Sequence, residues 1–124
     1  MKDGKHVILC VDDDPDVLSY LKLVLEAEGY VYVGAESAEQ GLRTYKEVHP
    51  DLIIVDLMME EVDAGTGFVK ELRALGNKAP IYMLSSVGDN LSMSTDYEKL
   101  GLEGVLQKPV AKDRLLKILK TKLG

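Results

Sequence analysis

The chain has 124 residues, of which 46% are hydrophobic and 29% are charged, and its formal net charge is −6. This size and balance are typical of one soluble globular domain and argue against disorder, while the negative charge argues against binding of nucleic acid or an anionic membrane surface. The single cysteine, Cys10, excludes an internal disulfide and a cysteine-based metal cluster, and its apolar neighbours predict an inert core thiol.

Short apolar runs alternate with amphipathic segments along the chain. The apolar runs predict buried β-strands, at 6–11, 30–35, 51–56, 81–84 and 105–107. The amphipathic segments predict helices, at about 15–28, 38–48, 67–75, 91–100 and 111–123. Asp14-Pro15 and Ser37 with Gln40 provide N-terminal caps for the first two helices. The alternation, without repeats or linkers, predicts an α/β domain with a doubly wound parallel sheet.

Charged and polar residues stand at the carboxyl ends of four predicted strands. Asp12 and Asp13 follow the first strand, and Asp56 ends the third. Ser85 follows the fourth strand, and Lys108 follows the fifth. Because the carboxyl ends of parallel strands share one edge, where open α/β sheets bind ligands, these side chains are expected to meet in one crevice.

Three carboxylates in one crevice predict a divalent cation, because like charges at short distance repel strongly. An oxygen-only set suits Mg²⁺, with Mn²⁺ as the alternative, better than zinc. Mg²⁺ is usually shared between carboxylates and a phosphate, so the set fits phosphoryl transfer with Asp56 as the nucleophile. Considered singly, the run 12–14 would be a helix-cap cluster, Ser85 a loop hydroxyl and Lys108 a surface lysine.

In this order and spacing, the motifs resemble the receiver domain of two-component response regulators. The resemblance is carried by Val11 to Pro15, Pro50 to Met59, Leu84 to Ser86, and Gln107 to Pro109. It covers nearly the whole chain and implies a flavodoxin-like (βα)5 sandwich of three layers, with strand order 2-1-3-4-5. Residues 1–124 are then expected to form a single receiver domain without an effector domain; whether the domain stands alone or was excised from a larger protein stays open.

The resemblance also implies how the crevice works. Asp56 is expected to accept a phosphoryl group from the phosphohistidine of a histidine kinase, and Ser85 and Lys108 to bind the phosphoryl oxygens. The Lys108-Pro109 peptide bond is expected to be cis, as is typical of the family. The domain is expected to assist only its own phosphorylation and dephosphorylation, and is not otherwise an enzyme.

The metal site implied by the resemblance uses four residues. Asp13 is expected to bind Mg²⁺ directly, with Asp12 assisting, often through water. Asp56 and the backbone carbonyl of Met58 complete the protein ligands.

The implied partners are a sensor histidine kinase or phosphotransfer protein, a downstream protein, and a second copy of the chain when phosphorylated. No direct nucleic-acid or membrane contact is expected. The N-terminus lacks the apolar core of a signal peptide, and no apolar run approaches the ~18 residues of a membrane span. The cytoplasm is therefore the expected location.

The chain departs from the family pattern in two places. In the loop after Asp56, Glu60 replaces a usual proline and about three residues are added before Phe68. Val105 stands where the family often has an aromatic switch residue.

Two other classes of function compete with phosphoryl acceptance. A haloacid-dehalogenase-type enzyme also uses an aspartate nucleophile and Mg²⁺, but it requires a second aspartate where this chain has Met58. A degenerate receiver would act as an interaction module without phosphorylation, although all five strand-end residues are chemically competent. The basic last helix predicts a solvated face, with partner docking as the alternative.

Overall fold

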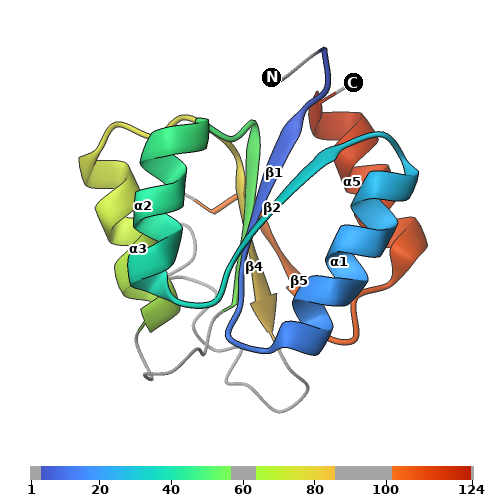
Figure 1. Cartoon of the computed structure of the whole chain (residues 1–124), viewed down its shortest axis with the longest axis horizontal. Coiled ribbons are helices and arrows are strands. Elements are labelled where there is room, and N and C mark those ends of the chain that lie inside the picture. Colours follow the sequence, from blue (N-terminus) through green and yellow to red (C-terminus); the bar gives the residue numbers. More distant parts are fainter. Residues whose placement is uncertain (1–3, 57–63, 86–101, 124) are drawn as a thin grey trace.

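The computed structural model describes residues 4–56, 64–85 and 102–123 (Figure 1). Five parallel strands form one sheet in the order β2-β1-β3-β4-β5, as predicted. The strands are β1 (Val7–Val11), β2 (Val31–Ala35), β3 (Leu52–Asp56), β4 (Ile81–Ser85) and β5 (Gly104–Gln107). The chain runs from β1 to the edge strand β2 and then crosses past β1 to β3. The strand order therefore reverses between β1 and β3.

The described helices form the two outer layers. They are α1 (Pro15–Ala27), α2 (Ala38–Val48), α3 (Ala64–Ala74) and α5 (Lys112–Leu123). Figure 1 shows α1 and α5 on one face of the sheet and α2 and α3 on the other. The helix predicted at 91–100 lies outside the described residues. Within the described part of the chain, no helix is long and apolar enough to cross a membrane.

The central strands are buried on both faces, which explains their unbroken apolar sequences. Successive side chains of β1 alternate between the two layers: Ile8 packs with α1 and α5, and Leu9 packs with α3. On the α2 side the layers approach closely at Gly41. A Cβ atom there would lie 3.0 Å from the Phe68 ring and 3.1 Å from Val11 Cγ2, so a larger residue would push α2 outward.

The predicted caps of the first two helices are present. Asp14 Oδ1 accepts a hydrogen bond from the Asp16 amide at 2.9 Å, and Gly29 follows the end of α1 with a φ of +86°. Ser37 Oγ accepts from the Gln40 amide at 3.1 Å. The Gln40 side chain, however, accepts from the amide of residue 36 rather than from that of the N-cap residue itself.

Helix α3 begins three residues earlier than predicted, at Ala64 rather than Gly67, and ends at Ala74. The predicted start was wrong because Gly65 and Gly67 have low helix propensity and drew the expected boundary toward Phe68. The α3 side chains that carry the packing are fully buried, namely Phe68, Val69 and Leu72.

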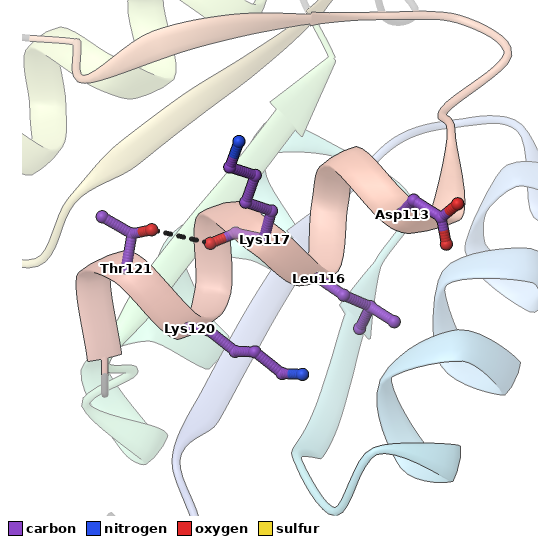
Figure 2. Close-up of a pocket in the computed structure, with 5 residues that line it drawn as sticks. All are labelled: Asp113, Leu116, Lys117, Lys120 and Thr121. Atoms are coloured by element: carbon purple, nitrogen blue, oxygen red, sulfur yellow. Dashed lines mark hydrogen bonds between the residues drawn. The ribbon is translucent and has the colours of Figure 1, made fainter.

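Helix α5 presents its cations to solvent, namely Lys112, Arg114, Lys117, Lys120 and Lys122. Figure 2 shows Lys117 and Lys120 extending in different directions, with Leu116 near the same side as Lys120. Leu116 is partly buried and packs against the core, and Thr121 Oγ1 donates to the Lys117 carbonyl at 2.9 Å. These exposures agree with a solvated basic face, while docking of a partner there stays a prediction.

Candidate functional site

The turn after β1 holds Asp12 in a fixed, buried position. Its amide donates to the Ala35 carbonyl at 3.0 Å, which continues the β1–β2 pairing by one residue. Its Oδ1 atom accepts from the Asp14 amide at 2.9 Å, so the segment that caps α1 also orients the Asp12 carboxylate. Asp13, the next residue, is exposed.

Asp56 and Ser85 are the last residues of two paired central strands, β3 and β4, and both are buried. The register pairs Asp56 with Leu84 and Ser85 with Gln107, so Lys108 follows directly on the neighbouring strand. The Lys108 amide donates to the Ser85 carbonyl at 2.8 Å. This backbone bond extends the sheet to the residue that carries the ammonium group.

The carboxylates of Asp12, Asp13 and Asp56 converge at this edge. One oxygen of each lies within 4.8 Å of the others, and two of the three residues are buried. The Oδ2 atom of Asp12 is buried. Three carboxylates this close repel one another, and a hard divalent cation such as Mg²⁺ would bind their oxygens and offset that repulsion. The donor set therefore fits the predicted metal.

Lys108 is the cation that the described residues bring to this cluster. Its Nζ atom lies 3.0 Å from Asp12 Oδ2 and 3.3 Å from Asp56 Oδ2. The contact to Asp12 is a short ion pair between the ammonium group and a buried carboxylate. Burial lowers the pKa of Lys108, but the attraction of Asp12 and Asp56 outweighs burial and raises the pKa above its ordinary value. Lys108 is therefore charged at neutral pH.

The structure brings four of the predicted site residues into direct proximity: Asp12, Asp13, Asp56 and Lys108. Ser85 is buried at the end of the adjacent strand. The Lys108-Pro109 bond is cis, as predicted. The predicted metal ligand Met58 lies outside the described residues, and so does Glu60.

Sequence reasoning missed two contacts that support this geometry. Asp51 stands at the start of the strand predicted at 51–56, and its Oδ2 atom accepts from the Val7 amide at 2.7 Å and joins β3 to β1. Tyr20 on α1 donates to the Val110 carbonyl at 2.9 Å. Asp51 lies in the motif run 50–59 and Tyr20 lies in no motif, but the partners are 44 and 90 residues apart in the chain.

Cys10 is buried in β1 and is free, as expected for a core thiol. Burial raises the pKa of the Cys10 thiol, and the nearby Asp12 carboxylate raises it further. The thiol therefore stays protonated at neutral pH and is a poor nucleophile. It takes no part in the chemistry of the site.

Comparison with known proteins agrees with this geometry. The family model for the response regulator receiver domain matches residues 8–120. The chemotaxis protein CheY of Bacillus subtilis is 34% identical over 120 residues, which are 96% of this chain and 98% of that protein.

The transcriptional regulatory protein GlrR of Escherichia coli is 38% identical over 108 residues, which are 87% of this chain. The match spans about a quarter of that regulator, 24% of its length. Among solved structures, a CheY-like response regulator receiver domain protein from Methanospirillum hungatei superposes with a TM-score of 0.88 at 28% identity, covering 97% of this chain and 94% of that one. The chain therefore belongs to the receiver domain family of two-component response regulators.

Proposed function

We propose that Asp56 accepts a phosphoryl group from the phosphohistidine of a histidine kinase or phosphotransfer protein, and that the phosphorylated domain signals by contact with another protein. Receiver domains are signalling domains that interact with such kinases and phosphotransfer proteins. The observation that carries the proposal is the cluster of Asp12, Asp13 and Asp56, with Lys108 paired to two of its carboxylates.

In the proposed transfer, a carboxylate oxygen of Asp56 attacks the phosphorus atom. An O–P bond forms, the N–P bond of phosphohistidine breaks, and the histidine nitrogen leaves with the electron pair. In the unphosphorylated site the Lys108 ammonium group already lies beside the Asp56 carboxylate. It is therefore placed to bind the phosphoryl oxygens once Asp56 is phosphorylated. Ser85 would donate a hydrogen bond to the same oxygens.

The residues that would hold Mg²⁺ are Asp12, Asp13 and Asp56, with the Met58 carbonyl as the predicted fourth ligand. When bound, Mg²⁺ supplies positive charge that offsets the charge of the carboxylates and of the incoming phosphoryl oxygens. The chain's own contribution is to keep two of these carboxylates buried and oriented, one of them by the Asp14 amide.

The test of the proposal is covalent labelling by acetyl phosphate, followed by intact mass measurement. One phosphoryl group is expected with Mg²⁺ and none with EDTA, and peptide mapping is expected to find it on Asp56. A protein that stays unlabelled with Mg²⁺ yet still binds its kinase would instead support the interaction module that acts without phosphorylation.

Mg²⁺ is expected to raise the melting temperature, because an ion that binds only the folded protein stabilises it by mass action. A tenfold excess over Kd contributes about 1.4 kcal/mol, which corresponds to roughly 3–6 °C for a domain of this size. Asp13→Ala should weaken this shift and should itself raise the melting temperature in EDTA by relieving repulsion. Differential scanning fluorimetry checks both effects, and a melting temperature indifferent to millimolar Mg²⁺ contradicts the metal site.

The phosphorylated form is expected to persist for minutes or longer. In the family, the residues two positions after the acceptor and two after the Ser/Thr flank the hydrolytic water; here they are Met58 and Val87, which lie outside the described residues. Neither side chain can orient a water molecule, a contribution typically worth ~10²–10⁴-fold. Loss of label after removal of the phosphodonor measures the lifetime. Met58→Asn with Val87→Glu should accelerate the loss, and decay of the parent within seconds contradicts the expectation.

A further inference from the structure

Lys108 lies in a four-residue connection, 108–111, between the end of β5 and the start of α5. Two contacts hold this connection to the sheet side of the molecule. The Lys108 amide donates to the Ser85 carbonyl at 2.8 Å, and the Val110 side chain is buried in the core between the sheet and α1 and α5. A third contact comes from α1, where the Tyr20 hydroxyl donates to the Val110 carbonyl at 2.9 Å.

The same helix, α1, starts at the acidic half of the site. Asp14, its N-cap residue, donates its amide to the Asp12 carboxylate at 2.9 Å. Helix α1 therefore holds Asp12 at its beginning and the Lys108 connection at Tyr20. The 3.0 Å ion pair between Lys108 Nζ and Asp12 Oδ2 links the turn at the start of α1 to the connection that Tyr20 contacts.

A pocket of about 300 Å³ adjoins the connection on the α1 side. The residues that line it are Asp16, Val17, Tyr20, Lys108, Pro109 and Val110. Because this side of the connection borders open space, loss of the Tyr20 hydrogen bond would release the Val110 backbone on the α1 side and let the Lys108 side chain shift.

We infer that Tyr20 is a positioning residue for phosphoryl transfer: through the Val110 carbonyl it holds Lys108 where the ammonium group meets Asp56 and the incoming phosphoryl oxygens. The inference rests on the proposed function and extends it to a residue outside the strand-end motifs. Tyr20 acts through the connection and does not itself touch the phosphoryl group.

The test compares two substitutions that each remove one phenolic hydrogen bond. Tyr20→Phe removes the bond to Val110. Tyr45→Phe removes the bond from Tyr45 on α2 to Asn77 Oδ1, which is 3.0 Å long and also partly buried. Asn77 precedes β4, at the opposite edge of the sheet from Asp56, so Tyr45→Phe is a matched control for stability without contact to the site.

The rate of labelling by acetyl phosphate at saturating Mg²⁺ is expected to fall about 3- to 10-fold in Tyr20→Phe and to stay at the parent rate in Tyr45→Phe. The Kd for Mg²⁺ is expected to be unchanged in both. In a Lys108→Met background, Tyr20→Phe should have no further effect, because the group it positions is gone. A purely structural role would slow labelling equally in both backgrounds.

Replacement of Tyr20 by 4-aminophenylalanine, which keeps a para N–H donor, should restore the labelling rate and keeps the test decisive if Tyr20→Phe folds poorly. The inference is overturned if Tyr20→Phe is labelled at the parent rate, if Tyr45→Phe is slowed equally, or if the amino derivative is as slow as the phenylalanine variant. Absence of labelling in the parent protein is a different result, because it overturns the proposed function itself.

Discussion

Asp56→Asn is expected to abolish phosphoryl incorporation from acetyl phosphate, which would be the largest effect of any single substitution in this chain. An amide oxygen is a far weaker nucleophile than a carboxylate and forms no stable acyl phosphate. The substitution is nearly isosteric at a buried position and removes one of three crowded carboxylate charges, so the fold should persist with an unchanged or higher melting temperature. Intact mass after incubation with donor and Mg²⁺ measures the loss.

The matched control is Asp51→Asn, at the other end of the same run of residues. Asp51 also carries a partly buried carboxylate, and its asparagine variant can still accept the Val7 amide through its carbonyl oxygen. Labelling should therefore continue in Asp51→Asn. Label that remains in Asp56→Asn would contradict the assignment, unless peptide mapping traced it to Ser85 or a neighbouring carboxylate that substitutes only in the variant.

The sheet could be predicted from the sequence because the signals were local and strong. The run from Leu52 to Val55 leaves no polar face, so it predicted a strand buried on both sides, and that strand is central. The caps at Asp14 and Ser37 predicted the first two helix starts because capping depends on neighbouring residues. The strand order came from the resemblance to receiver domains, since alternation alone fixes only a parallel sheet.

Contacts between residues that are far apart in the chain could not be predicted, because the sequence signals were local. Strand-end residues could be grouped at one edge, but nothing in the sequence indicated that Lys108 pairs with Asp12 more closely than with Asp56 in the resting site. The Tyr20 hydrogen bond to Val110 joins residues that are 90 positions apart in the chain, and no motif encodes it. The predicted start of α3 was three residues too late because two glycines, which have low helix propensity, stand in the first turn of the helix.

Lys108→Met is expected to lower the free energy of unfolding by about 1–3 kcal/mol in EDTA. Removing one partner of a buried ion pair typically costs about 3–5 kcal/mol, and the partial exposure of Lys108 to water reduces this figure. The loss arises because the ammonium group that lies beside Asp12 Oδ2 and Asp56 Oδ2 is then gone. Urea denaturation measures it, and Lys112→Met on the exposed start of α5 should change stability by less than about 0.5 kcal/mol.

Two further measurements separate charge compensation from simple packing of the lysine side chain. Mg²⁺ should stabilise Lys108→Met more than the parent protein, because the ion then supplies the positive charge that the ammonium group supplied. Adding Asp12→Asn to Lys108→Met should recover part of the loss, since it removes a buried charge that has lost its partner. If Lys108→Met is as stable as the parent in EDTA, or if Asp12→Asn destabilises it further, Lys108 does not balance the acidic cluster and its charge matters only once a phosphoryl group is present.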